Sequence, residues 1–295
     1  MFGIKSNTQL RNDSVLLYSV DRIKTCIHAR QFKMFLWPKL FFNMSAIGKE
    51  HNNCIKVAHK LTDDIVKTKR QEREIRKQNG DTTKPNVSVL DLLLDVNENC
   101  EHFSDAHIRA EIDGFVFGGH DTISSALSWV LFLVASHPQV QEKLHQEIDE
   151  VFGGEKFKIL TSRDLKNLTY LECVIKESLR RFPTVPIIGR KLESDVTLIG
   201  TASVNINGRV IPADVSVYIN IFKLHRDPVV YPNPDKFEPD RFLPENCANR
   251  HPYAFIPFSG GPRNCLGKAE ICYDGRKNYS FSNFAFFYDK SCKHT

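Results

Sequence analysis

Apolar residues recur at the spacing of a helix face in two stretches near the N-terminal end of the chain. The first stretch follows Asn12 and Asp13, which are good N-cap residues. The apolar positions are Leu16, Val20, Ile23 and Ile27 in the first stretch and Cys54, Ala58, Leu61 and Ile65 in the second. This spacing predicts two helices, separated by a break over the aromatic segment 32–42. We expect the charged segment 67–77, which has no apolar period, to be a solvated end of the second helix.

The middle of the chain contains further helical patterns. The segment 104–136 is apolar on almost every face, which is typical of a buried central helix. The amphipathic pattern that begins at Pro138 ends at a pair of glycines and predicts another helix. A short apolar helix is predicted over 87–94 and a longer helix over 165–182.

The C-terminal half differs in pattern from the helical part. From Asp195 to Ile221, β-branched residues alternate with polar residues around Asn207 and Gly208, which predicts a hairpin. The segment 228–257 is rich in Pro, Asn and Asp and predicts a long ordered loop. The expected fold class is therefore mainly α, with a helical core, a small β hairpin region and this loop.

Composition excludes several classes of protein. With 41% hydrophobic and 25% charged residues among 295, the chain is typical of a folded protein. The net charge of +5 is too small to mark a protein that binds DNA or RNA, so we expect no nucleic-acid partner. Eight cysteines without a CxxC pair indicate reduced thiols facing the cytosol. No apolar run approaches the length of a spanning helix, so as written the chain has no anchor.

One cysteine lies in an unusual glycine-rich loop. In the stretch Phe258-Ser-Gly-Gly-Pro-Arg-Asn-Cys-Leu-Gly267, two glycines precede Cys265 and one follows it. Glycines let the backbone turn tightly and let a flat ligand approach the sulfur. Two alternatives remain: a buried free cysteine, and a structural metal site formed by Cys265, Cys272 and His251, whose spacing fits no zinc pattern.

The five positions Phe258, Gly261, Arg263, Cys265 and Gly267 resemble the motif of the cytochrome P450 superfamily of haem-thiolate monooxygenases. The resemblance implies that Cys265 is the axial ligand of the iron of haem b, whose thiolate donates electron density that favours O–O cleavage. It also implies that Arg263 pairs with a haem propionate. Independent stretches in the same order support the resemblance from Met1 to Lys268.

A second stretch, from Gly118 to Thr122, resembles the oxygen-binding segment of that family. Its glycines would thin the helix wall, and the resemblance assigns Thr122 to proton relay and Asp121 to its acidic partner. Without the resemblance, Asp-Thr within a helix is ordinary scaffold. Members of family 4 often carry a Glu that can esterify the haem where this chain has Gly118. We therefore expect haem that is held non-covalently apart from the Cys265 thiolate, and the departure weakens the case for strict terminal hydroxylation.

Further segments match the family around the cysteine loop. Glu177 and Arg180 alone predict a solvated pair, but with Arg241 they resemble the family's buried triad that supports the cysteine loop. The resemblance also assigns Arg190 to a haem propionate. The apolar residues expected to border substrate are Phe115, Val116, Phe117, Val185, Ile187 and Ile188. The segments 225–228 and 237–246 are closest to family 4, the fatty-acid branch.

Both ends of the chain depart from the family. We interpret the chain as lacking the family's N-terminal third, with its membrane anchor and small β-rich lobe, and the likeness stops after Lys268. We therefore expect a partial cytochrome P450 domain over 1–268 and a tail without family likeness over 269–295. We also expect uncovered apolar faces on 104–136 and 165–182, poor solubility and no turnover by the chain exactly as written.

The resemblance implies an enzyme of the EC 1.14 class that inserts one oxygen atom from O2 into a fatty-acid-like or xenobiotic substrate. Electrons would come from NADPH through NADPH-cytochrome reductase. The full-length protein would lie on the cytosolic face of the endoplasmic reticulum membrane. The alternative is a truncated or degenerate relative that does not retain haem and has no catalytic activity.

Overall fold

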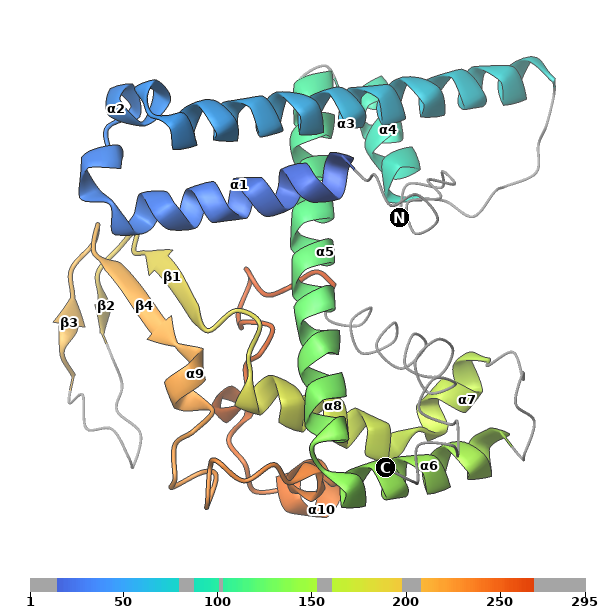
Figure 1. Ribbon diagram of the computed structural model, residues 1–295, viewed down its shortest axis with the longest axis vertical. Coiled ribbons are helices and arrows are strands. Elements are labelled where there is room, and N and C mark those ends of the chain that lie inside the picture. The colour runs from blue at the N-terminus through green and yellow to red at the C-terminus, as the bar shows by residue number, and fades with distance from the viewer. Residues whose placement is uncertain (1–14, 80–87, 101–102, 153–160, 198–207, 268–295) are drawn as a thin grey trace. The chain divides into compact units, whose positions relative to one another are not determined.

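The computed structural model describes residues 15–79, 88–100, 103–152, 161–197 and 208–267 (Figure 1). The chain divides into two compact units, Met1–His120 and Asp121–Thr295. Helices dominate both units and short antiparallel strands occur in the second, so the expected fold class, mainly α with a small β region, is confirmed.

The first unit consists of helices. They are α1 (Val15–Phe32), the 3-10 turn η1 (Met34–Leu36), α2 (Lys39–Met44), α3 (Ala46–Gln78), α4 (Val89–Asn99) and the first part of α5 (Asp105–Ala135). Both predicted N-terminal helices are confirmed, and the expected break between them holds η1 and α2. A Cβ on Gly48 would lie 1.8 Å from the carbonyl oxygen of Phe42, so only glycine fits where α2 meets α3.

Two contacts organise this unit. The long helix α3 lies alongside α1, and the Arg22 guanidinium donates two hydrogen bonds of 2.7 Å to the Glu50 carboxylate across that contact (Figure 1). A buried core joins α3 to α4 and to the start of α5. Its members are Val66, Leu90, Leu94, Ile108 and Ile112.

The expectation of a solvated end for α3 is only partly correct: the segment 74–77 is exposed, whereas Lys69 and Arg73 pair with α4. Lys69 is only 4% exposed, and its ammonium group lies 3.2 Å from the Asp91 carboxylate of α4. Arg73, one turn later, pairs with Asp95 on the same helix. The apolar period gives no sign of this pairing, because it depends on acidic residues of α4, a helix that continues beyond its predicted end.

The second unit builds its core from helices. They are the rest of α5, α6 (Pro138–Phe152), α7 (Ser162–Asn167), α8 (Thr169–Arg181), α9 (Ile221–Leu224) and α10 (Pro244–Cys247). The core residues come mainly from α5, α6 and α8. They are Ala126, Val130, Leu133, Val134, Val140, Leu144, Ile148, Leu168, Leu171, Val174, Ile175, Leu179 and Phe237.

The single helix predicted over 165–182 is two helices, α7 and α8, which meet at Leu168. The Glu147 carboxylate of α6 accepts hydrogen bonds from the backbone N–H of Tyr170 at 2.5 Å and of Leu171 at 2.9 Å. These amides lie in the first turn of α8, where no intrahelical partner exists. A side chain from a neighbouring helix therefore caps a new start that the apolar period does not reveal.

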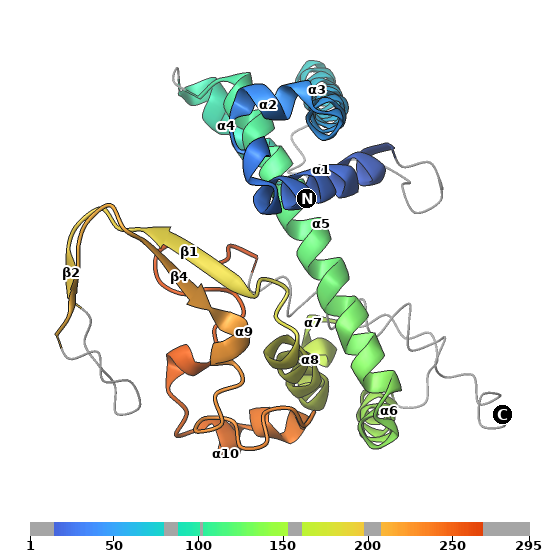
Figure 2. The ribbon, with the colours of Figure 1, turned by 60° about the vertical axis from the view of Figure 1, so that its left-hand side comes forward.

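Two small antiparallel pairs complete the second unit (Figure 2). Strand β1 (Ile187–Lys191) pairs with β4 (Ser216–Asn220), and β2 (Val196–Thr197) pairs with β3 (Val210–Ile211). The β2–β3 pairing lies within the predicted hairpin; of its expected turn, Gly208 is described and Asn207 lies outside the described residues. The predicted loop holds only short turns, η2 (Pro239–Phe242), α10 and η3 (Pro252–Ala254).

The expectations for the exposed faces of the two apolar helices have different outcomes. On α8, Leu171, Val174 and Leu179 are buried, so the expectation of an uncovered α8 is wrong. Helix α5 has buried residues near both ends, but Phe117 and Phe132 are exposed. The expected uncovered apolar surface is therefore present on α5, and α5 is not the fully buried helix that its composition predicts. Among the described residues no single helix is long and apolar enough to cross a membrane; α5 and α6 pass that test only as a pair bent by 107°.

Candidate functional site

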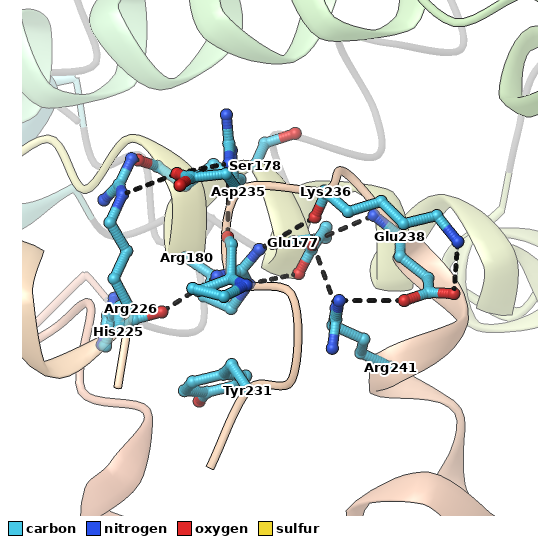
Figure 3. Close-up of polar contacts among 12 residues, drawn as sticks. Glu177, Ser178, Arg180, His225, Arg226, Tyr231, Asp235, Lys236, Glu238 and Arg241 are labelled. Carbon is cyan, nitrogen blue, oxygen red and sulfur yellow. Dashed lines mark hydrogen bonds and ion pairs between the residues drawn. The ribbon is translucent and has the colours of Figure 1, made fainter. Parts of the chain in front are cut away.

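A fully buried ion pair on α8 lies at the centre of a group of polar contacts in the second unit (Figure 3). The Arg180 guanidinium donates to Glu177 Oε2 at 2.7 Å and to Oε1 at 2.8 Å, and both side chains have no exposed surface. Their spacing of three residues places them on one face of α8. A solvated pair is excluded by this burial.

The pair also holds loop backbone from two later segments. Arg180 donates to the carbonyl oxygen of His225 at 2.9 Å and to that of Lys236 at 3.2 Å. The Glu177 carboxylate accepts from the backbone N–H of Glu238 at 3.0 Å. Buried charges need such partners, since an unpaired charge out of water is costly. The pair therefore fixes the path of the chain between α9 and η2.

Arg241 reaches the same carboxylate from η2. Its Nε lies 3.7 Å from Glu177 Oε1, and its Nη2 donates to the carbonyl oxygen of Asn233 at 3.2 Å. Nη2 also lies 2.9 Å from the Glu238 carboxylate. The structure thus brings together Glu177, Arg180 and Arg241, the three residues that the sequence grouped.

Two buried side chains beside this cluster received no role from the sequence. His225 has no exposed surface, and its Nε2 accepts from the backbone N–H of Ile256 at 3.0 Å. Burial, together with the nearby charges of Arg180 and Arg226, lowers the pKa of His225 to about 4. Nothing in the sequence of the segment 225–228 reveals what the imidazole contacts.

The second such side chain is Tyr231. Its hydroxyl donates to the carbonyl oxygen of Ala254 at 3.1 Å, and burial raises its pKa to about 12. The guanidinium carbons of Arg180 and Arg250 lie 5.1 and 4.9 Å from the centre of its ring. Tyr231 therefore joins the buried pair to the chain that leads into the cysteine loop.

The cysteine loop is a tight turn closed by its own backbone. The backbone N–H of Cys265 donates to the carbonyl oxygen of Phe258 at 3.0 Å. Within the turn, Ser259 and Gly261 have φ values of 64° and 76°, in the left-handed region that glycine adopts most readily. The Phe258 ring packs against the core, and Cys265 is a half-buried free thiol. Gly267 ends the described part of the loop.

Arg190 of β1 contacts this loop from the side. Its Nη2 donates to Ser259 Oγ at 3.1 Å and to the carbonyl oxygen of Arg263 at 3.3 Å. The side chains of Arg190 and Arg263 are exposed. A haem needs a thiolate for its iron and cations for its carboxylates, and the loop offers Cys265 with Arg190 and Arg263. These three residues therefore fit the chemistry of a haem group.

The other predicted site residues stay predictions. Asp121 and Thr122 are half-buried on α5, and a Cβ on Gly118 or Gly119 would meet no atom within 4 Å. Of the predicted substrate residues, Phe115 and Phe117 belong to the first unit. Those of the second unit, at the start of β1 and just before it, are Val185, Ile187 and Ile188.

No metal cluster replaces the cysteine site in the part of the chain that the structure describes. There, no group of three or more His, Cys, Asp or Glu side chains is close enough to hold a metal ion. Cys272, a member of the alternative metal site, lies outside the described residues.

Acidification is expected to destabilise the fold through His225. The ordinary pKa of about 6.5 applies in the unfolded chain, so between pH 6.5 and about 4 the unfolded state binds more protons than the folded state. The stabilisation is complete above pH 6.5 and falls with pH, by about 3 kcal/mol in total near pH 4. His225→Gln cannot titrate and should lose less stability on acidification. Denaturant titrations at about pH 7 and about pH 4.5 measure this, and equal losses in both proteins would refute it.

Comparisons with known proteins agree with the motifs. The family model described as cytochrome P450 matches residues 1–269. The chain is 38% identical to cytochrome P450 4c3 of Drosophila melanogaster over 279 residues, which are 90% of this chain and 51% of that protein. It is 39% identical to cytochrome P450 4V2 of Homo sapiens, over 90% of this chain and 50% of that protein. With cytochrome P450 4F8 of Homo sapiens it shares 36% identity, over 91% of this chain and 51% of that protein.

The chain spans about half the length of the curated relatives it matches. Over that half, the residues matched include the α8 pair, the strand with Arg190 and the loop with Cys265, each of which the sequence predicts as a separate motif. The helical core with a small β region agrees with a partial fold of the same kind. The chain belongs to the cytochrome P450 family.

Proposed function

We propose that this chain forms the haem-binding half of a monooxygenase. The observation that carries the proposal is the turn around Cys265, a loop with a half-buried thiol that Phe258 anchors in the core and that the Arg190 guanidinium contacts. The family and its relatives support haem monooxygenase chemistry in general. When bound, haem b would supply the iron at which dioxygen is activated.

Residues of the cysteine loop and of β1 would hold the haem. Cys265 would ligate the iron as a thiolate, and the guanidinium groups of Arg190 and Arg263 would pair with the propionates. Glycines at 261 and 267 would let the loop approach the ring closely. Because Gly118 carries no carboxylate, the protein would hold the haem without an ester bond.

Thr122 and Asp121 would move protons to the reacting oxygen. A hydroxyl and a carboxylate on one helix can relay a proton in from water, which general acid catalysis requires. The overall reaction takes O2, two electrons and two protons, and gives a hydroxylated substrate and water. NADPH would supply the electrons through NADPH-cytochrome reductase.

The substrate would be apolar, fatty-acid-like or xenobiotic. The residues proposed to border it, Phe115, Phe117, Val185, Ile187 and Ile188, carry no charge. We place the full-length protein on the cytosolic face of the endoplasmic reticulum membrane.

The function is tested by replacing the relay residue. In a protein of full family length that contains this chain, Thr122→Ala should lower hydroxylated product per NADPH by about 10²-fold or more, with reducing equivalents lost as hydrogen peroxide. Ser128→Ala is the matched control, because Ser128 is an exposed hydroxyl on the same helix that bonds to the carbonyl oxygen of Ser124. Unchanged product per NADPH in Thr122→Ala would overturn the relay. Product without oxygen from labelled O2 in the unsubstituted protein would overturn the function.

A further inference from the structure

His225 bonds both to Arg180 of the buried pair (Figure 3) and to the chain that leads into the cysteine loop. Its backbone carbonyl accepts from Arg180, and its ring accepts from Ile256. The ring also stacks at a tilt on Phe255, with centroids 5.1 Å apart. One residue therefore contacts the pair through its backbone and the loop through its side chain.

From Ile256 the contacts continue to the cysteine. The carbonyl oxygen of Ile256 accepts from the backbone N–H of Ser259 at 3.1 Å, which starts the tight turn. The carbonyl oxygen of Phe258 then accepts from the backbone N–H of Cys265 at 3.0 Å, which closes it. The N–H and the carbonyl of Ile256 belong to the two peptide groups on either side of this residue, so holding Ile256 fixes the start of the turn that Phe258 and Cys265 close.

The backbone and the ring of His225 contribute separately. Any residue at this position supplies the carbonyl oxygen that Arg180 binds, whereas the acceptor for Ile256 requires a nitrogen or oxygen at the place of Nε2. An apolar ring would leave the Ile256 amide without that acceptor, which is costly where water is excluded.

We propose that the His225 imidazole is a positioning residue for the cysteine loop, acting by holding the Ile256 amide. The functional meaning of the proposal rests on the proposed role of Cys265 as the iron ligand. The hydrogen bonding itself does not depend on haem.

Hydrogen exchange, followed in a protein of full family length that contains this chain, tests the connection. In His225→Phe, exchange should accelerate about tenfold at the amides of Ile256 and Cys265. The amide of Glu238, which bonds to Glu177, should be unchanged, because Arg180 keeps its carbonyl partner. His225→Gln, whose side-chain oxygen reaches about as far as Nε2, should restore slow exchange at both sites.

His251→Gln is the matched control. His251 is an exposed histidine in the same loop, and its ring accepts from the backbone N–H of Tyr253 at 3.2 Å. In the hydrogen bonds of the described residues, its carbonyl oxygen does not contact the buried pair. It should leave exchange at Ile256 and Cys265 as it is. Slow exchange at Cys265 in His225→Phe, or equal acceleration at Cys265 and Glu238, would overturn the proposal.

The two hypotheses fail in different experiments. Haem titration of the same proteins should give a Soret band whose thiolate character is reduced in His225→Phe and regained in His225→Gln. A thiolate band that survives in His225→Phe would count against positioning. A band that is unaltered by Cys265→Ser would refute the role of Cys265 as the iron ligand. The hydrogen-exchange result would then decide by itself whether His225 positions the loop.

Discussion

Arg180→Leu is expected to lower the free energy of unfolding by about 3–5 kcal/mol, the usual cost of removing one partner from a buried ion pair. Arg180 has no exposed surface, and its loss leaves the buried Glu177 carboxylate with only the Glu238 amide and Arg241 at 3.7 Å. Two carbonyl oxygens, of His225 and Lys236, lose their donor at the same time. A loss of this size is a large fraction of the stability of an ordinary domain.

The measurement is a denaturant titration beside a control on the same helix. Lys176 of α8 pairs with Glu172 one turn away, and both side chains are about one-third exposed. Lys176→Met should cost about 0.5 kcal/mol or less, because exposed pairs on a helix contribute little. Arg180→Lys keeps the charge but not the two-pronged contact and should lie between them. A cost for Arg180→Leu as small as that for Lys176→Met would show that the pair does not hold the loop.

The sequence predicted the helices best where one apolar face decided them. The stripes from Leu16 and from Cys54 correspond to α1 and α3, because a core residue every three or four positions is enough to define a buried face. The prediction missed the pairing of Lys69 with α4 and the break at Leu168. Asp91 of α4 pairs with the Lys69 ammonium group, and Glu147 of α6 accepts from the first amides of α8. Both contacts come from another helix, so the spacing of apolar residues within one helix cannot predict them.

The candidate site was predicted as separate motifs, and the structure adds their connections. Glu177, Arg180 and Arg241 were grouped by resemblance, and their closeness is visible in the distances. The contact of Arg190 with Ser259 joins residues far apart in the sequence, which no spacing reveals. His225 and Tyr231 were missed for the same reason: a histidine or tyrosine in a loop has no pattern that distinguishes burial from exposure.

Cys265→Ser should abolish thiolate coordination completely. A serine hydroxyl does not ionise near neutral pH and is a poor ligand for iron compared with a thiolate. The loop backbone should be preserved, because the Cys265 amide and not its sulfur closes the turn on Phe258. The effect should therefore fall on the bond to iron and leave the fold in place. Cys100→Ser is the control, since Cys100 is an exposed free cysteine at the end of α4.

The direct test of the haem-binding account is the absorption spectrum of the reduced, carbon-monoxide-bound protein. It is recorded on a protein of full family length containing this chain, as the unsubstituted form, Cys265→Ser and Cys100→Ser. The account predicts the Soret position of a haem-thiolate in the first and last of these, and loss of that band in Cys265→Ser. A Cys265→Ser protein that keeps the Soret position of the unsubstituted form would contradict the account.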